Sequence, residues 1–353
     1  MSKAAICVVV PVYKAMATLD RCVESVLAQQ VEGGLTCILV DDGSPDESGA
    51  LCDAWAAKDD RVTVIHQDDL GVSGARNSGL AAADSEFIVF LDSDDALRPG
   101  ALQAALTAQR AAPQDFVVWH YTTDEKDPAA VTADAEPRTQ TGLARLWLDC
   151  LLAMPWNKLY RADLAKQLQF DVQYTLGEDL QFVLDYIALL GQTVPEFGYR
   201  VMTSPLTFYD CSRGGTLSTR YHANYCDIWP KHFAKLNTAC HAAACPAEDM
   251  RPLHRAELQV FAEGVADIMR RDPSPTQRLK GYKAEAALRS PWLRALLERM
   301  KIEHCYSAYY LPCRWRNVGL VCRVDEARRA NAPLYGKLDW AWYYLLLGRM
   351  RRD

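Results

Sequence analysis

Several features are missing from the sequence, and each absence excludes a class of protein. No run among the 353 residues reaches the ~20 apolar residues that a membrane-spanning helix needs. The N-terminus enters a strand-like run at residues 4–11 directly, which leaves no room for a secretory signal peptide. The 12 cysteines include no C-x-x-C pair, and no His/Cys spacing indicates zinc. We therefore expect a cytoplasmic protein with free, mostly buried thiols.

The common nucleotide-binding fingerprints are also missing. The first expected turn between a strand and a helix holds residues 11–14, Pro-Val-Tyr-Lys, where a dinucleotide-binding fold needs its G-x-G-x-x-G. No G-x-x-x-x-G-K-[ST] stretch is present either, which excludes a P-loop kinase. The net charge of −6 argues against a general nucleic-acid binder.

Charge is distributed unevenly along the chain. Residues 289–353 hold 13 Lys and Arg against 6 Asp and Glu, interleaved with Trp and Tyr. Such a segment fits contact with an anionic membrane surface at the inner face of the cell membrane. It equally fits a helical domain that uses its aromatic residues as a core and keeps its cations in water. The sequence leaves both interpretations open.

Strand and helix signals alternate over the first 120 residues, which predicts a mostly parallel α/β sheet with helices on both faces. The strands are nearly continuous apolar runs, as expected for burial on both faces. Residues 122–141 are polar and rich in Pro and Ala, which predicts a surface excursion. From residue 221 onward the signals are helical, so we expect one domain at 1–220 and a smaller helical one at 221–353. The expected strands are 6–10, 37–40, 62–65, 87–91, 116–120, 156–160 and 194–209, and the expected helices are 18–30, 46–58, 73–83 and 100–110.

A cluster of carboxylates follows the fourth expected strand. Asp92, Asp94 and Asp95 fall within four residues, directly after the apolar run 87–91. The strand would deliver them to the carboxyl edge of the sheet, where open α/β folds bind ligands. Two such charges about 4 Å apart repel by roughly 4 kcal/mol at an effective dielectric near 20. A Mg²⁺ or Mn²⁺ ion holding a diphosphate would relieve this repulsion, whereas the alternative is a solvated Asp-rich turn.

The order of the motifs resembles one known family. Residues 11–13 (Pro-Val-Tyr), 40–44 (Val-Asp-Asp-Gly-Ser), 71–80 with Ala-Arg-Asn, and 90–95 follow one another as in family 2 glycosyltransferases. The later runs 156–160 and 177–179 also resemble that family, so the resemblance covers roughly residues 5 to 220. It implies the GT-A fold and an inverting transferase of the type that builds bacterial cell-surface polysaccharides.

The resemblance also implies roles for individual residues on the donor side. Asp94 would be the metal ligand of a D-x-D element, with Asp92 supporting the metal or touching the ribose. Arg76 would lie near the diphosphate, and Asp95 would either sit against the sugar or support the residues that contact it. The remaining donor-binding residues would be Pro11, Val12 and Tyr13 around the base, Asp41 in contact with it, Ser93 beside the aspartates, and Arg213 on the glycine-rich loop 212–218.

On the acceptor side the resemblance implies that Asp179 is the general base, with Glu178 and Trp156 lining the site. At a helix start these two carboxylates would alternatively only cap the helix. The chain departs from the family pattern at Asp69, where relatives often have Asn. His222 follows the glycine-rich loop closely and is a weaker candidate for metal or diphosphate contact.

The expected reaction is metal-dependent transfer of a hexosyl or N-acetylhexosaminyl group from a nucleoside-diphosphate sugar, in the first instance a UDP-sugar. The acceptor would be a hydroxyl of a glycan or a lipid-linked molecule, and a homodimer is a further expectation. Two rivals remain: a sugar nucleotidyltransferase, which lacks support because Lys14 alone is a poor triphosphate loop, and a non-catalytic glycan-binding protein on the same fold.

Overall fold

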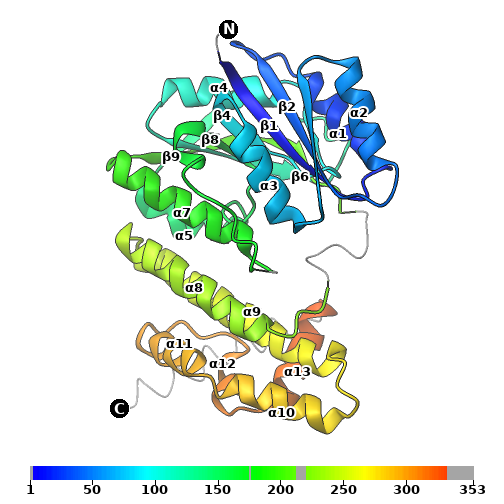
Figure 1. Ribbon diagram of the computed structural model, residues 1–353. Coiled ribbons are helices and arrows are strands. Elements are labelled where there is room, and N and C mark those ends of the chain that lie inside the picture. Colours follow the sequence, from blue (N-terminus) through cyan, green and yellow to red (C-terminus); the bar gives the residue numbers. More distant parts are fainter. Residues whose placement is uncertain (1–2, 175, 212–219, 332–353) are drawn as a thin grey trace. The chain divides into compact units, whose positions relative to one another are not determined.

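The computed structural model describes residues 3–174, 176–211 and 220–331. By its internal contacts the chain divides into two compact units, Met1–Gly214 and Gly215–Asp353. None of the helices in the described ranges is long and apolar enough to cross a membrane. Figure 1 shows the first unit as a sheet with helices and the second as helices alone.

The first unit is built on one twisted sheet with the strand order β3-β2-β1-β4-β8-β6-β9-β5, with β7 paired to β9. Strands β3, β2, β1 and β4 run parallel, and β8 is antiparallel to both β4 and β6. This arrangement and the helical second unit confirm the fold predicted from the sequence. The strands are β1 (Ala4–Val12), β2 (Leu35–Asp42), β3 (Val62–Gln67), β4 (Ser85–Phe90), β5 (Ala96–Leu97), β6 (Phe116–Thr122), β7 (Ala135–Thr139), β8 (Lys158–Arg161) and β9 (Gly198–Phe208).

Helices cover both faces of this sheet (Figure 1). On one face, alternate residues of β1 such as Ile6 and Val8 join a core with α1 and α4. On the other face α3 lies so close to β1 that a Cβ added at Gly79 would be 2.3 Å from a Val9 methyl. The helices of the first unit are α1 (Leu19–Leu27), α2 (Ser48–Lys58), α3 (Gly71–Ala82), α4 (Ala101–Ala111), α5 (Leu143–Leu148), α6 (Ala162–Ala165) and α7 (Glu178–Thr193), with a 3-10 turn at Gln140–Gly142.

Two expectations about strands need correction. The first strand does not close at Pro11 but continues to Val12, with Pro11 opposite Val40 of β2. Its pairing with β4 already ends at Val9, so the missing N–H of proline costs no bond to that neighbour. The segment 122–141 is not wholly an excursion either, because β7 within it pairs antiparallel with β9. An exposed edge strand of polar residues carries little hydrophobic signal.

The second unit is a group of helices packed around α9. Its core combines Leu258, Phe261 and Val265 of α9 with the buried rings of Tyr306, Tyr309 and Tyr310, among other residues. Those three tyrosines therefore serve as core, as one of the two interpretations of the C-terminal aromatics predicted. The helices are α8 (Tyr225–Ala242), α9 (Ala247–Arg271), α10 (Gln277–Leu288), α11 (Pro291–Ile302), α12 (Tyr310–Arg314) and α13 (Val318–Arg329).

Candidate active site

Three neighbouring strands bring their carboxyl ends, and the loops after them, to one edge of the sheet. Asp41 of β2 lies opposite Val12 of β1, and Phe90 of β4 lies opposite Val9. The Leu91 amide still donates to the Val9 carbonyl, 3.0 Å away, before the chain turns into the aspartate cluster. The predicted loops therefore do meet at the edge where open α/β sheets bind ligands.

An aromatic cluster fixes the start of α7 beside this edge. The ring of Phe90 makes edge-on contacts with Phe170 and Phe182, with centroids 5.2 and 5.8 Å apart, and Phe170 stacks on Phe182 at 4.0 Å. Phe90 precedes Asp92 by two residues, and Phe182 follows Asp179 by three. The packing of apolar residues on β4 and α7 thus holds the two carboxylates near each other.

A buried guanidinium joins those two carboxylates. Arg76 of α3 is 3% exposed, and its two terminal nitrogens donate to Asp179 Oδ1 at 2.5 Å and to Asp92 Oδ1 at 2.8 Å. Burial by itself lowers the pKa of Arg76, but Asp179 and Asp92 together raise it above its usual value. The sequence placed Arg76 near the diphosphate. It did not predict that Arg76 bridges the aspartate cluster and the start of α7.

Asp179 and Glu178 are the first residues of α7, after Gly177 in the left-handed conformation. Burial raises the pKa of Asp179 to about 7, with further increases from Glu178 and Asp92 and an opposing effect of Arg76. A carboxylate with a pKa near neutrality is suited to accept a proton at physiological pH. Glu178 is half-buried beside it.

The turn of residues 92–95 buries one of its carboxylates completely. The Asp95 amide donates to the Asp92 carbonyl at 3.0 Å, and the Asp95 side chain is 0% exposed. Its Oδ1 accepts from the Asp210 amide at 2.9 Å, whereas Oδ2 is buried without a hydrogen-bond partner within the described residues. Burial, with added repulsion from Asp92 and Asp94, raises the pKa of Asp95 to about 9.

Asp94 and Ser93 are half-buried in the same turn, and Asp94 is anchored by residues that the sequence did not single out. One terminal nitrogen of Arg21 donates both to the Asp94 carbonyl at 2.6 Å and to Asp210 at 2.7 Å. Arg21 comes from α1 and Asp210 follows β9. Neither residue stands in a motif, so only the meeting of distant segments identifies them.

The donor set of this turn fits a hard divalent cation. Asp92, Asp94 and Asp95 offer carboxylate oxygens, the ligands that Mg²⁺ and Mn²⁺ prefer. The buried Oδ2 atom of Asp95 without a partner, and the raised pKa of this residue, both indicate a shortage of positive charge. Arg76 supplies such charge only on the side of Asp92 and Asp179.

The expected base-binding residues lie at the ends of β1 and β2. Pro11 and Val12 are buried within β1, and Tyr13 is the exposed residue of the three. Asp41 is buried, accepts from the Ser44 amide and contacts His66 Nδ1 at 3.0 Å. Burial would raise the pKa of Asp41, but these hydrogen bonds hold it below its usual value.

The turn after Asp41 depends on a glycine. Gly43 has φ +66, and an added Cβ would lie 2.9 Å from the backbone nitrogen of Asp69. The turn after β2 thus packs directly against the exposed segment before α3. His66 of β3 bridges Asp41 and Asp53 through its two ring nitrogens.

Trp156 is buried and stacks on Tyr209, with centroids 5.4 Å apart and rings 17° from parallel. Tyr121 packs edge-on against both rings. Tyr209 directly precedes Asp210, so the stack is linked to the turn that holds Asp95. Sequence reasoning missed Tyr121 and Tyr209, which carry no motif.

Two remaining candidates are not part of the geometry above. Arg213 and the glycine-rich loop fall outside the described residues. His222 belongs to the second unit.

Comparisons with known proteins agree with the fold and with the order of the loops. Residues 7–169 match the family model described as Glycosyl transferase family 2. This match ends before α7, so it does not include Glu178 and Asp179. The chain is 39% identical over 124 residues to glycosyltransferase GlyG of Streptococcus pneumoniae, covering 35% of this chain and 41% of that protein.

Another relative is the succinoglycan biosynthesis protein ExoO of Rhizobium meliloti, 31% identical over 211 residues, covering 54% of this chain and 58% of ExoO. The chain spans about half the length of the curated relatives it matches.

Among solved structures, S. aureus TarS 1-349 in complex with UDP-GlcNAc superposes with a TM-score of 0.61 at 17% identity, covering 93% of this chain and 92% of that one. The mannosyltransferase PcManGT of Pyrobaculum calidifontis, with GDP-Man and Mn²⁺, gives a TM-score of 0.50 at 17% identity, covering 91% and 86%. At these identities the likeness concerns the fold.

Proposed function

Because residues 7–169 match the model of Glycosyl transferase family 2, we propose that the chain transfers a sugar from a nucleoside-diphosphate sugar to a hydroxyl group in cell-surface polysaccharide synthesis. The observation that carries this proposal is the Arg76 bridge between Asp92 and Asp179. It joins a carboxylate cluster suited to a metal and diphosphate to a carboxylate suited to act as a base.

In the proposed reaction the acceptor oxygen attacks the anomeric carbon while the bond from that carbon to the diphosphate oxygen breaks. The electron pair of that bond leaves with the diphosphate, and the hydroxyl proton passes to Asp179. We assign the proton to Oδ2, because Oδ1 is held by Arg76. Attack from the face opposite the leaving group inverts the anomeric configuration, and Glu178 and Trp156 would line the acceptor side.

On the donor side Asp94 and Asp92 would hold Mn²⁺ or Mg²⁺, which supplies positive charge against the charge that grows on the diphosphate. Asp95 would support this turn from its buried position, with Ser93 at its surface. Tyr13 is exposed at the end of β1, where its ring can stack on a base.

We further propose that the donor is a UDP-linked hexose or N-acetylhexosamine. TarS, with UDP-GlcNAc, is the better-superposing of the two neighbours, and PcManGT holds GDP-Man. Asp41 at the end of β2 would accept a hydrogen bond from the base. Thermal shift with UDP- and GDP-sugars would rank the donors, because a ligand that binds the folded state raises its apparent stability. A shift with GDP-sugars alone would contradict the UDP assignment.

Donor turnover tests the function itself. The full-length protein is incubated with a panel of nucleotide sugars and Mn²⁺, and released nucleoside diphosphate is measured. We expect release with at least one donor, and Asp94→Asn should abolish metal-dependent nucleotide binding. Asp84→Asn is the matched control, because this exposed aspartate stands just before β4, at the end opposite the cluster. No release with any donor or acceptor, together with no metal-dependent nucleotide binding, would refute the proposal.

For the acceptor we propose a glycan or lipid-linked molecule, with the second unit touching an anionic membrane surface. Trp315 is 57% exposed. It lines a cavity of about 340 Å³ together with four arginines from α10 to α12 and the adjoining turns. The four are Arg289, Arg294, Arg314 and Arg316. Flotation with anionic vesicles should recover the protein, and Trp315→Ala combined with Arg294→Glu and Arg316→Glu should reduce recovery. Equal recovery of the wild-type protein and of this triple variant would contradict docking through the cavity beside Trp315. The homodimer remains a prediction.

A further inference from the structure

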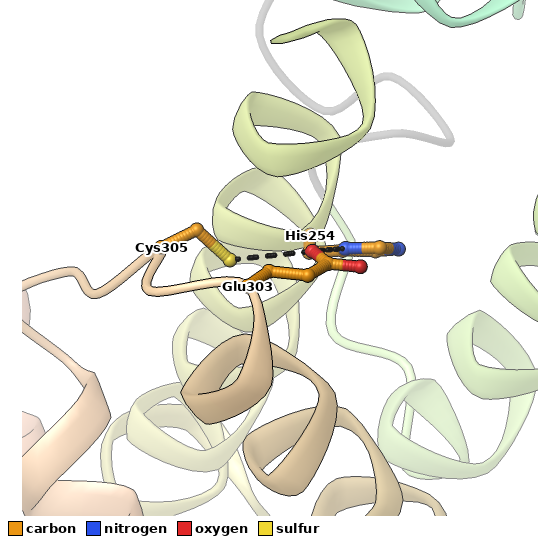
Figure 2. Close-up of side chains that lie close together, drawn as sticks. All are labelled: His254, Glu303 and Cys305. Atoms are coloured by element: carbon orange, nitrogen blue, oxygen red, sulfur yellow. Dashed lines mark hydrogen bonds and ion pairs between the residues drawn. The ribbon is translucent and has the colours of Figure 1, made fainter. Parts of the chain in front are cut away.

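Three side chains with different ligand chemistry converge in the second unit (Figure 2). His254 comes from α9, and Glu303 and Cys305 follow α11. His254 Nδ1 lies 2.6 Å from Glu303 Oε2, which lies 3.6 Å from the Cys305 sulfur, and all three ligand atoms are within 4.8 Å of one another. The histidine and the cysteine are buried, whereas the glutamate side chain is 28% exposed.

Two side chains of opposite hydrogen-bonding character, Asn237 and Arg299, contact Nε2 of the His254 ring. Asn237 Nδ2 donates to the Phe233 carbonyl at 2.9 Å and to Glu257 at 2.7 Å, so both amide hydrogens are used. Its Oδ1, which can only accept, faces His254 Nε2 at 3.2 Å. Arg299 Nη1, which can only donate, faces the same Nε2 at 3.3 Å. Asn237 thus favours a hydrogen on Nε2, whereas Arg299 favours a lone pair there. In the first of these tautomers the lone pair of Nδ1 faces Glu303. A contact through the other ring nitrogen is typical of metal-binding histidines.

With the hydrogen on Nε2, a lone pair of His254 Nδ1 faces the Glu303 oxygen across 2.6 Å, whereas with the hydrogen on Nδ1 this atom donates to Glu303. The first arrangement is repulsive. Adding a second proton to His254 would relieve the repulsion, but the ring is buried and Arg299 lies 3.3 Å from its Nε2. Both burial and a neighbouring cation disfavour a charged imidazole. The thiol of Cys305 can donate only one hydrogen to the same oxygen. A cation between the three atoms would satisfy all of them at once.

The backbone between Glu303 and Cys305 has a conformation that brings both side chains to the same side of the chain. His304 has φ 55, in the left-handed region where glycine is usual, and the Cys305 amide donates to the Met300 carbonyl at 3.0 Å. This is the arrangement of a helix-ending Schellman turn. A residue other than glycine adopts this conformation only at an energetic cost.

We propose that His254 Nδ1, Glu303 and Cys305 bind a divalent cation of borderline softness, with Zn²⁺ as the best match and water in the fourth position. The three donor types, N, O and S, are those of zinc, whereas Mg²⁺ and Ca²⁺ avoid sulfur. Tetrahedral coordination requires Nδ1 and Oε2 to separate to about 3.4 Å at metal–ligand distances of about 2.1 Å. A rotation of the half-exposed Glu303 side chain provides this. The ion would connect the N-terminal part of α9 to the end of α11.

Cobalt is the probe for this site, because Co²⁺ bound to a thiolate absorbs in the near ultraviolet and Co²⁺ bound to carboxylates alone does not. The full-length, metal-stripped protein is titrated with Co²⁺, and we expect a thiolate band that saturates at one equivalent and is displaced by Zn²⁺. Cobalt at the aspartate turn of the first unit lacks a thiolate and does not contribute. Absence of the band in the wild-type protein would overturn the proposal.

Variants identify the thiolate. Cys305→Ser and Glu303→Gln should each weaken Co²⁺ binding about tenfold or more. Cys240→Ser is the matched control, because its thiol hydrogen-bonds to that of Cys245 in the same unit, outside the cluster. A band that survives Cys305→Ser and disappears in Cys240→Ser would refute the assignment. If Cys305→Ser does not fold, zinc-edge X-ray absorption of the wild-type protein decides, because a ligand sphere without sulfur excludes the site.

Discussion

In the first unit the buried guanidinium of Arg76 lies between the carboxylates of Asp92 and Asp179, whereas in the second unit the carboxylate of Glu303 lies against an imidazole and a thiol. Asp92 and Asp179 therefore have a positive charge beside them, the guanidinium of Arg76. Among the described residues, neither Asp95 nor Glu303 forms an ion pair with a lysine or an arginine. A carboxylate that a protein partly buries without a neighbouring cation requires a proton or an added ion. The comparison therefore distinguishes carboxylates that a neighbouring arginine neutralises from carboxylates that a bound ion or a proton would have to neutralise.

The largest expected effect comes from removing the carboxylate that we assign as base. Asp179→Asn keeps the acceptor for Arg76 but cannot take a proton, so turnover should fall by about 10²–10⁴-fold with donor binding retained. The pKa of Asp179 is raised to about 7, so the wild-type rate should fall as the pH drops through this value. Initial rates from pH 5.5 to 9 (an experimental range chosen around that pKa) test both statements. Undiminished turnover of the variant would reassign the base.

The counter-charge itself is tested by Arg76→Met. Removing the guanidinium leaves Asp92 and Asp179 without their charged partner, which should lower the free energy of unfolding by about 2–3 kcal/mol. Arg61→Met provides the contrast, because Arg61 pairs with Asp59 at the surface and should change stability by less than about 1 kcal/mol. Urea denaturation of both variants measures the difference. Equal losses would mean that the Arg76 bridge does not stabilise the first unit.

Asp95→Asn tests the carboxylate without a counter-charge. Because burial raises the pKa of Asp95 to about 9, the folded state binds more protons than the unfolded state from about pH 4 to 9. Its contribution to stability therefore falls as pH rises through this window, by at most about 1.4 kcal/mol per pH unit. Asparagine keeps the acceptor for the Asp210 amide but has no proton to lose, so this slope should disappear.

The measurement for Asp95→Asn is the free energy of unfolding against pH in the presence of a chelator. Adding Mg²⁺ to the wild-type protein should raise stability at the alkaline end and leave the variant unchanged. Parallel pH profiles for the two proteins would contradict an isolated buried acid.

The smallest effect is expected for the corresponding change in the second unit. In Glu303→Gln the side-chain amide can donate to His254 Nδ1 when the ring hydrogen is on Nε2, and its oxygen can accept when the hydrogen is on Nδ1, so the pair needs no metal. The stability of the metal-free variant should therefore stay within about 1 kcal/mol of the wild type. Urea denaturation in the presence of a chelator measures the free energy of unfolding of both proteins. A loss of several kcal/mol in the variant would show that His254 and Glu303 share a proton and already stabilise the second unit without a metal.

Much of the first unit followed from the sequence because its signals are local. Apolar runs such as 37–40 and 87–91 predicted buried parallel strands, and the loops after them held Asp41 and Asp92 at the same sheet edge. The polar strand β7 was missed because an exposed edge strand needs no apolar face. Contacts between distant segments, such as Arg21 with Asp210, have no local signal at all.

The sequence by itself determined most of the alternation of strands and helices in the first unit and which loops carry carboxylates, because these depend on residue patterns a few positions long. Only the tertiary structure decided how those charges are neutralised. Arg76 reaches Asp179 across 103 positions of sequence, and His254 meets Glu303 across 49. The physical reason is that the charge balance of a buried carboxylate depends on which side chains lie within a few ångströms, and packing of the core sets those neighbours.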